Sequence, residues 1–437
     1  MSTLAVHKGN GGNGGTTLAA LPLPAMEKID ETSVPRSLLE ELALKIIYLH
    51  GEMTLRELTQ EMKLSLGVVM EIFQRLRQEQ LCEVKGMVGG VYRVATTSAG
   101  KARALELLSQ NLYTGPAPVS LTDYINRVRA QSVRTIEVRP PAVQQAFSHL
   151  VLSERTVNQL GTAIVSGSSV FLHGPTGTGK TSIAETLPKV YEDQVWLPYA
   201  VELDGQIITV YDAIVHEALP FDADPENADA RWVLCRRPKI ITGGELTMEM
   251  LDLQYNPNAK FYSAPLQMKA NNGVLIIDDF GRQRIRPEEL LNRWIVPLDR
   301  QIDFLTLMGG KKFEIPFDLF VVFSTNLDPS SLADEAFLRR IHNKILIDNV
   351  TREQFHEIFR RVCGKLELNY DPAIVDYLMD KITEELRQPL RPCYPRDIVS
   401  QIMWGARYRG EPARLDREAV GRACHNYFLG DQSAAAD

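Results

Sequence analysis

The chain has 437 residues, of which 44% are apolar and 24% are charged, and its formal net charge is −7. This length predicts two or three domains, and the composition is that of an ordinary globular protein. The negative charge argues against a nucleic-acid coat protein or a protein that covers an anionic membrane surface. The sequence contains no run of 18 apolar residues, so neither a membrane helix nor a membrane partner is expected.

The cysteines predict a reducing compartment. They are odd in number, widely scattered and without a CxxC pair, at Cys82, Cys235, Cys363, Cys393 and Cys424. This pattern favours free thiols over a disulfide framework or a zinc site. The N-terminus lacks an apolar core followed by a cleavage site, so no secretion signal is expected. Together these features predict a cytoplasmic protein.

The N-terminal third predicts a tail followed by a small helical domain. Residues 1–35 contain "GNGGNGGTT" and "LPLPAM", which favour a flexible tail, and residues 431–437 form a second tail. Within 36–113, three amphipathic helices precede a glycine-bearing hairpin and a fourth helix. Thr54 and Glu57 have the spacing of a capping box, and Ser65 is the expected N-cap of the third helix. This order of elements resembles a winged-helix domain.

The remaining chain predicts an α/β domain and a helical domain. Residues 114–141 contain prolines and are interpreted as a linker that can pack. From 142 to 350, helical patterns alternate with the β-branched runs "SVFLHG", "VLIID", "DLFVVFSTN" and "KILI". Such alternation predicts an α/β fold with a parallel sheet covered by helices. Residues 351–430 show only helical patterns, which indicates a separate helical domain.

The segment "FLHGPTGTGKTS" matches G-x-x-x-x-G-K-[ST], with Gly174, Gly179, Lys180 and Thr181 at the fixed positions. Glycines let backbone N–H groups converge on phosphate oxygens, and the following helix presents its N-terminus to the same anion. In such loops the lysine reaches the β- and γ-phosphates, and the hydroxyl binds Mg²⁺. The sequence therefore predicts ATP and Mg²⁺ as cofactors. The remaining residues of the predicted nucleotide-binding loop are Pro175, Thr176, Gly177, Thr178 and Ser182.

Two carboxylates follow the apolar run "VLII". A phosphate loop needs a carboxylate at a neighbouring strand end for the magnesium shell, and Asp278 is the candidate. Asp279 is placed to orient and deprotonate the attacking water. Asn326, which ends the apolar run "LFVVFSTN", is a candidate to hold the same water. The plain alternatives are a solvated strand end for the aspartates and an ordinary strand-to-loop residue for Asn326.

Three arginines are further candidates. Arg339 and Arg340 precede an apolar run, where one of them could serve a neighbouring subunit as an arginine finger on the γ-phosphate. Arg396 begins a helix of the C-terminal domain and could reach the nucleotide. The alternatives are solvated or paired arginines at 339 and 340, and a pair between Arg396 and Asp397.

The order of these motifs resembles an AAA+ ATPase over about residues 142–430. The resemblance implies that "GPTGTGKT" is Walker A, "VLIIDD" is Walker B and Asn326 is sensor 1. It further implies that Arg340, with Arg339 as the alternative, is the arginine finger and that Arg396 is sensor 2. The resemblance also implies ATP hydrolysis in a ring of subunits, expected to be a hexamer.

Lys180 and Asp278 lie 98 positions apart, which is long for this superfamily and implies inserted material. The segments "SAPLQMKANNGVLIIDD" and "LLNRWIVPLDRQIDFLTLMGGKKFEIPFDLFVVFSTN" resemble MoxR-type and magnesium-chelatase-type ATPases. The second of these predicts a β-hairpin turning at Gly309 and Gly310. This resemblance implies that the ring remodels a protein client.

One position departs from the family pattern. The family usually has Glu where this chain has Asp279, and Asp is shorter by roughly 1.3 Å. Slow hydrolysis is therefore one expectation, and a nucleotide-bound scaffold that hydrolyses little is a further alternative.

The predicted winged-helix region leaves two uses open. The first turns of its third helix, residues 66–70, are apolar and unsuited to reading bases. Residues 75–103 nevertheless carry several basic side chains that could contact phosphates. Binding of a protein, or assembly of the ring, is one hypothesis. The other is a DNA-binding ATPase or transcription regulator that contacts DNA through residues 36–113.

Overall fold

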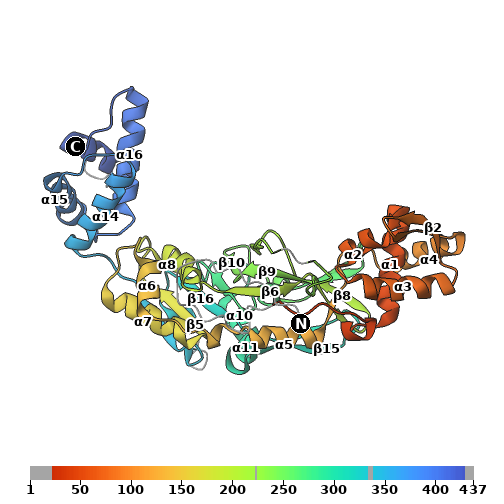
Figure 1. The fold of residues 1–437 in the computed structure, drawn as a ribbon. Helices are drawn as coiled ribbons and strands as arrows, with labels where there is room; N and C mark the ends of the chain where they lie inside the picture. The colour runs from red at the N-terminus through yellow and green to blue at the C-terminus, as the bar shows by residue number, and fades with distance from the viewer. Residues whose placement is uncertain (1–21, 222–223, 333–337, 429–437) are drawn as a thin grey trace. The chain divides into compact units, whose positions relative to one another are not determined.

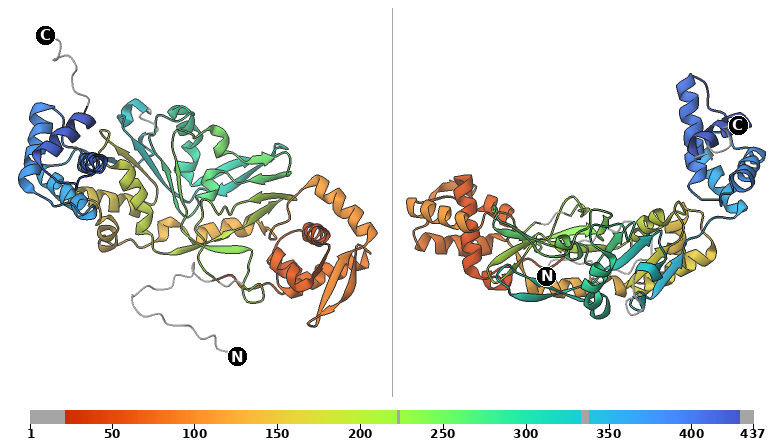
Figure 2. Two further views of the ribbon diagram at one scale, coloured as in Figure 1. Left: turned by 90° about the horizontal axis from the view of Figure 1, so that it is seen from above. Right: turned by 180° about the vertical axis from the view of Figure 1, so that it is seen from behind.

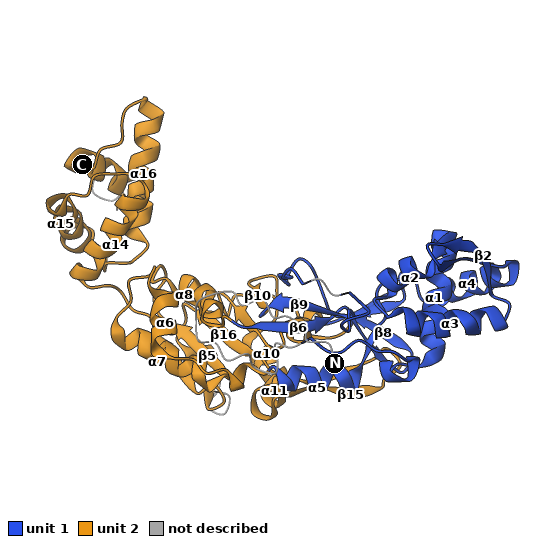
Figure 3. Ribbon diagram, viewed as in Figure 1, with its two compact units in different colours: residues 1–131, 193–237, 254–264 blue, residues 132–192, 238–253, 265–437 orange. Residues whose placement is uncertain are grey.

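The computed structural model describes residues 22–221, 224–332 and 338–428 (Figure 1). Residues 1–21 of the predicted N-terminal tail and the whole predicted tail at 431–437 lie outside the described part. The chain forms two compact units (Figure 3). Unit 1 contains residues 1–131, 193–237 and 254–264, and unit 2 contains residues 132–192, 238–253 and 265–437.

Unit 1 combines a helical region with short strands. Its helices are η2 (Ile29–Thr32), α1 (Arg36–His50), α2 (Leu55–Met62), α3 (Leu66–Gln78), α4 (Ser98–Gln110) and α5 (Leu121–Ala130). Its strands are β1 (Glu52–Thr54), β2 (Cys82–Val88), β3 (Val91–Thr96), β4 (Val119–Ser120), β6 (Gln194–Pro198), β7 (Ala200–Leu203), β8 (Gln206–Thr209), β9 (Trp232–Arg236), β11 (Gln254–Asn256) and β12 (Phe261–Ser263).

The helices and the hairpin predicted within 36–113 are confirmed. Thr54 and Glu57 form the expected capping box, in which the Glu57 N–H donates to the Thr54 hydroxyl at 3.2 Å. Ser65 caps α3 as predicted. The short strand β1 adds to the hairpin in the order β1-β3-β2 and was not predicted. Three residues are too few to give a strand pattern of their own.

Most of the inserted material predicted between Lys180 and Asp278, namely residues 193–237 and 254–264 (the insert), belongs to unit 1, whereas the sequence division placed it within 142–350. Its strands β7, β8, β11 and β12 form a five-stranded sheet with β4, in the order β11-β12-β8-β7-β4. β4 and α5 come from residues 114–141, the predicted linker, and Val119 and Tyr124 there are fully buried. A linker with buried side chains is a structural part of the unit. The strands β6 and β9 pair with each other in an antiparallel ladder.

Residues 22–35 differ from the predicted flexible tail. Ile29 and Val34 are buried in the core of unit 1. Arg231 of the insert, whose side chain is 3% exposed, forms an ion pair with Asp229 at 2.9 Å. Its guanidinium also donates to the carbonyls of Thr32 and Pro118 at 3.1 and 3.0 Å. Arg231 therefore joins three stretches of chain that are far apart in the sequence.

Unit 2 contains a parallel sheet, a hairpin and a helical bundle. Its helices are η3 (Val133–Thr135), α6 (Pro140–Phe147), α7 (Glu154–Ser166), α8 (Lys180–Thr186), η4 (Leu187–Val190), η5 (Met248–Leu251), α9 (Leu266–Lys269), α10 (Pro287–Arg293), α11 (Ile295–Arg300), α12 (Pro329–Leu332), α14 (Arg352–Lys365), α15 (Pro372–Asp380), the π-helical η6 (Lys381–Glu385), α16 (Tyr394–Arg409) and α17 (Arg417–Tyr427). Its strands are β5 (Ser169–His173), β10 (Lys239–Thr242), β13 (Val274–Ile277), β14 (Ile302–Thr306), β15 (Lys312–Pro316), β16 (Phe320–Thr325) and β17 (Asn343–Leu346).

The predicted α/β class with a parallel-sheet core is confirmed. Five strands run parallel in the order β10-β13-β16-β5-β17. β13 and β16 are buried at every residue, as expected for inner strands covered on both faces. Gly273 precedes β13 because a Cβ there would lie 2.1 Å from the Pro238 carbonyl oxygen. That close approach lets β10 and β13 pair from their first residues.

The predicted hairpin is also confirmed. β14 and β15 pair in an antiparallel ladder from Ile302↔Pro316 to Thr306↔Lys312. Gly310 in the turn has φ +84°, a conformation that glycine adopts readily. Phe304 and Met308 are 47% and 72% exposed, so the hairpin presents apolar side chains to solvent.

The C-terminal helices α14–α17 gather into one bundle, drawn in blue in Figure 2. Phe355, Phe359 and Cys363 recur along one face of α14 and are fully buried in the core of this bundle. Within the described ranges, no helix is long and apolar enough to span a membrane. All five cysteines are free, as the sequence predicted.

We expect Arg231→Ala to lower the free energy of unfolding of unit 1 by about 3–5 kcal/mol, because the change leaves Asp229 buried without its partner. Arg236→Ala is the matched control, since Arg236 pairs with Glu217 on the surface with both side chains more than 60% exposed. Its loss should cost less than about 1 kcal/mol. Urea unfolding followed by tryptophan fluorescence measures both, and equal losses would contradict a structural role for Arg231.

Candidate functional site

The candidate site lies at the carboxyl ends of three adjacent parallel strands of unit 2. β5 leads into the phosphate-loop sequence, β13 ends just before Asp278, and β16 ends just before Asn326. β16 lies between the other two strands. Because parallel strands end at the same edge of a sheet, the topology brings the separate sequence motifs together.

The backbone of the loop has the conformation that its glycines permit. Gly174, Gly177 and Gly179 have φ values of +142°, +80° and +89°. At Gly174 a Cβ would lie 2.2 Å from the Ile347 carbonyl oxygen. At Gly177 a Cβ would lie 2.7 Å from the Cys393 sulfur. The loop therefore needs glycine for backbone conformation and for space.

Lys180 begins α8 and is 6% exposed. Its Nζ donates to the carbonyls of Gly174 and Pro175 at 2.9 and 2.7 Å, which places the ammonium group inside the loop. Burial lowers the pKa of Lys180, while the carboxylates of Asp278 and Asp279 act in the opposite direction. A cation held here by the loop itself is suited to an anionic ligand.

The Thr181 hydroxyl donates to the Asp278 carboxylate, with distances of 3.1 and 2.9 Å to its two oxygens. Asp278 is fixed from its backbone, because its N–H donates to the Thr242 carbonyl at 2.9 Å and its carbonyl accepts from Gln283 at 2.8 Å. Mg²⁺ is commonly held by one or two protein oxygens together with phosphate oxygens and water. The Thr181–Asp278 pair is a donor set of this kind, so the residues present fit the ion.

Asp279 and Asn326 also face each other. The Asn326 side-chain amide donates to the Asp279 carboxylate at 3.2 Å. Asp279 has φ +48°, a left-handed conformation that Asp and Asn tolerate better than most residues. Its carboxylate is exposed, while the next residue, Phe280, is fully packed on the sheet core. The strand end thus directs Asp279 outward and keeps it beside Asn326.

A cleft of about 590 Å³ brings most of the predicted site residues together. Its lining includes Asp279, Asn326, Arg396 and the loop residues Thr176, Gly177, Thr178, Gly179, Lys180, Thr181 and Ser182. Gly174 and Pro175 contact Lys180 from the start of the loop, and Asp278 joins the set through Thr181. Arg396 is exposed and donates to Asp397 at 3.3 Å, so the predicted alternative pairing exists although Arg396 lines the cleft.

Arg339 and Arg340 are not among the residues that line this cleft. Arg340 forms an ion pair with Asp299 at the end of α11, at 2.8 Å. This pair is consistent with the paired alternative for Arg340, and a role at the site of another subunit stays a prediction.

The apolar part of the cleft was missed by sequence reasoning. It is lined from the connection between α6 and α7, from the segment that follows β17, and from α14. Its apolar residues include Leu150, Val151, Leu152, Ile347, Val350, Ile358 and Val362.

The α14 side of the cleft left a signal in the sequence. Ile358, Arg361, Val362 and Lys365 have the spacing of one helix face, apart from the face of α14 that is buried in the bundle. This spacing predicts a second face on α14, but it does not show which surface of the protein that face contacts.

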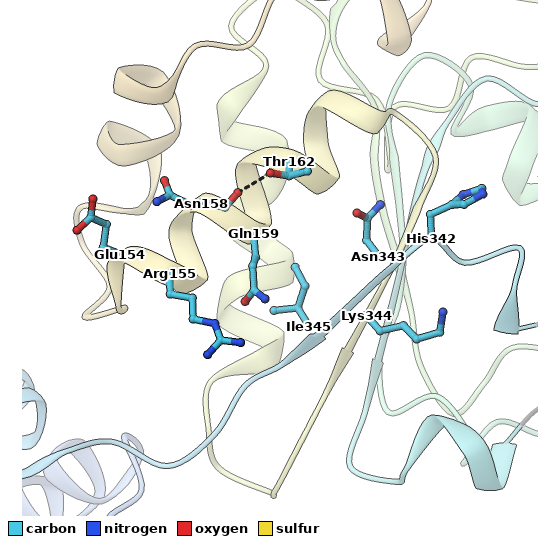
Figure 4. Close-up of a pocket in the computed structure, with 9 residues that line it drawn as sticks. All are labelled: Glu154, Arg155, Asn158, Gln159, Thr162, His342, Asn343, Lys344 and Ile345. Carbon is cyan, nitrogen blue, oxygen red and sulfur yellow. Dashed lines mark hydrogen bonds between the residues drawn. The ribbon is translucent and has the colours of Figure 1, made fainter.

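A second hollow, of about 640 Å³, lies between α7 and β17 (Figure 4). It is lined by Glu154, Arg155, Asn158, Gln159 and Thr162 of α7 and by residues 342–345. Lys344 there donates to the carbonyls of Leu338 and Ile341. The hollow contains none of the predicted site residues.

The fold and the site define a parallel α/β protein with a phosphate-loop motif. A family model described as a domain of unknown function (DUF8689) matches residues 351–426, which cover the bundle α14–α17. The comparison with curated proteins gives no match.

Solved structures show a distant likeness. RuvB from Thermotoga maritima, described as a Holliday junction branch migration motor, is 15% identical with a TM-score of 0.36, over 62% of this chain and 68% of that one. NtrX from Brucella abortus is 14% identical with a TM-score of 0.38, over 62% of this chain and 55% of that one. Both TM-scores are low, so neither likeness indicates a function for this chain.

Proposed function

We propose that this protein is an ATP hydrolase of the AAA+ type. The observation that carries the proposal is the bond between Thr181 and Asp278. It joins the last residue of the phosphate-loop motif to the first acid after β13, although 97 positions separate them. If the loop sequence were a chance match, a contact between its last residue and a carboxylate at a strand end would not be expected.

The loop would bind the triphosphate through its backbone N–H groups, with Lys180 beside the β- and γ-phosphates. Thr181 and Asp278 would hold Mg²⁺, which offsets phosphate charge when bound. Asp279 would take a proton from water while the water oxygen forms its bond to the γ-phosphorus. The bond from that phosphorus to the bridging oxygen would break, with the electron pair leaving on ADP. Asn326, bonded to Asp279, would orient the same water.

The finer assignment is a MoxR-like motor that remodels a protein client in a ring, expected to be a hexamer. Arg340, with Arg339 as the alternative, would act on the nucleotide of the neighbouring subunit. Arg396 would act on the nucleotide bound to the same subunit. The exposed Phe304 and Met308 of the β14–β15 hairpin support contact with a client. The five free cysteines support a cytoplasmic location.

The winged-helix-like region supports binding of protein better than binding of DNA. A DNA-reading domain of this kind places the N-terminal turns of its third helix in the major groove. Here the Glu226 carboxylate accepts from the Leu66 N–H at 2.6 Å, at the start of α3. Ser65 donates to the Met26 carbonyl at 2.5 Å, and a Cβ at Gly67 would lie 2.8 Å from the Glu27 carbonyl oxygen. The chain itself covers this helix end and places a carboxylate there.

The basic side chains of the same region are largely engaged with acids. Ion pairs hold Arg75 to Glu79, Lys85 to Glu83, Arg93 to Glu52 and Arg103 to Glu41 and Glu106. These acids offset the positive charge that would draw the region to phosphates. The alternative of a DNA-binding regulator therefore has less support than a protein-binding role.

We expect Lys180→Ala to weaken binding of ADP by at least about tenfold, because it removes the cation inside the loop. Lys189→Ala changes a lysine nine positions later, outside the loop, and should leave binding unchanged. Titration calorimetry with Mg²⁺ present measures both. Equal affinity of Lys180→Ala and the unaltered protein would count against the phosphate-loop assignment.

Asp279→Asn should lower the ATPase turnover about 100-fold or more and leave the affinity for ATP unchanged. Asn tolerates the left-handed backbone, so the change tests the carboxylate without adding strain. Asp328→Asn, an exposed acid at the same strand end, is the control. Full turnover in Asp279→Asn would show that Asp279 is not the base. Faster turnover in Asp279→Glu would show that the shorter side chain of Asp279 limits the rate of hydrolysis. No turnover in the unaltered protein, with ATP still bound, would favour the scaffold alternative.

The unaltered protein should not bind duplex DNA at about 50 mM salt, since the end of α3 is covered and the basic residues are paired. Fluorescence anisotropy with a labelled duplex measures this, and a protein that binds DNA serves as the positive control. Binding that weakens steeply as salt is raised would instead support the DNA-acting alternative.

A further inference from the structure

The apolar part of the cleft has two sides that belong to different cores. Leu150 and Leu152, in the connection between α6 and α7, pack against the core of the parallel sheet. Val362, on α14, packs against the core of the helical bundle. The width of the cleft therefore depends on the contacts that hold α14 against residues 148–152.

Arg361 makes contacts of this kind. It lies on α14 among the residues that line the cleft, and its side chain is 38% exposed. Its Nη1 donates to the Ser148 carbonyl at 2.8 Å and to the Leu150 carbonyl at 3.4 Å. Its Nε donates to Glu357 one turn earlier at 2.7 Å, which holds the guanidinium group in place.

The acceptors explain why a cation belongs at this position. Ser148 is the C-cap of α6, where the last carbonyls of the helix have no partner within it. The negative end of the helix dipole lies at the same place. A guanidinium group satisfies both needs, and it can donate to two carbonyls because its N–H groups are fixed in one plane.

We propose that Arg361 is a positioning residue for the base of the bound nucleotide. It holds α14 against residues 148–152, so that Leu150 and Val151 on one side and Ile358 and Val362 on the other form an apolar slot. The phosphates bind elsewhere in the same cleft, at residues 176–182. The inference rests on the proposed function, because it concerns a nucleotide held by that loop.

The test compares two ligands that share phosphates and differ in the base. Titration calorimetry of the full chain with Mg²⁺ measures the affinity for ADP and for inorganic tripolyphosphate. Arg361→Gln should weaken ADP binding by about tenfold, since it removes charge-assisted hydrogen bonds that hold the slot. Tripolyphosphate binding should stay within about twofold, because the phosphate loop is unchanged.

Arg360→Gln is the matched control. Arg360 is exposed and adjacent, and its described bonds go to Glu357 alone. Both ligands should bind this variant as they bind the unaltered protein.

Two results would overturn the role of Arg361 while leaving the ATPase proposal intact. One is unchanged ADP affinity in Arg361→Gln. The other is an equal loss of ADP and tripolyphosphate affinity, which would mean a general effect on the cleft. Failure of the unaltered protein to bind either ligand would overturn the proposed function and this inference together.

Discussion

The Thr181–Asp278 hydrogen bond joins the start of α8, which follows β5 and the glycine-rich loop, to the residue after β13. The strands β5 and β13 are not neighbours, since β16 lies between them. The bond forms only when all three strands run parallel and end at the same level. The buried inner strands stabilise that arrangement through their apolar surface. Gly273 allows β13 to start close to Pro238, and the Thr242 carbonyl fixes the Asp278 backbone. The chemistry proposed for the site therefore depends on register within the sheet.

The inserted segment gives the chain an unusual connectivity. Residues 193–237 and 254–264 belong to unit 1, so the chain passes between the two units at five places instead of one. β10, which follows directly after the longer of these stretches, pairs with β13. Arg237, at the end of that stretch, forms an ion pair with Asp193 at its start, at 2.6 Å. This ion pair therefore brings the two ends of residues 193–237 together. The chain then continues directly into β10, the strand that pairs with β13 of the Walker B-like segment.

The two halves of the cleft are built differently, one mainly around the backbone of the glycine-rich loop and the other from apolar side chains. The half proposed to bind phosphate is built around a backbone whose conformation glycine permits, with Ile347 and Cys393 packed closely against Gly174 and Gly177. The apolar half is built from side chains on two separate cores, and its shape depends on bonds such as those of Arg361. A site of this construction can keep its loop intact while the fit of the base changes.

The sequence by itself determined the local features. The loop glycines, Lys180 and Thr181, the capping box of α2 and the hairpin turn at Gly310 depend on short-range chemistry that residue order records directly. Asp278, Asp279 and Asn326 were identifiable because parallel strands place their carboxyl ends at one edge. Only the tertiary structure decided that residues 22–35 and the insert share the core of unit 1, that Glu226 covers the start of α3, and that Leu150 and Val362 line one cleft. These contacts join residues separated by roughly 160 to 210 positions, and the spacing of residues along a chain holds no information about which distant surfaces meet.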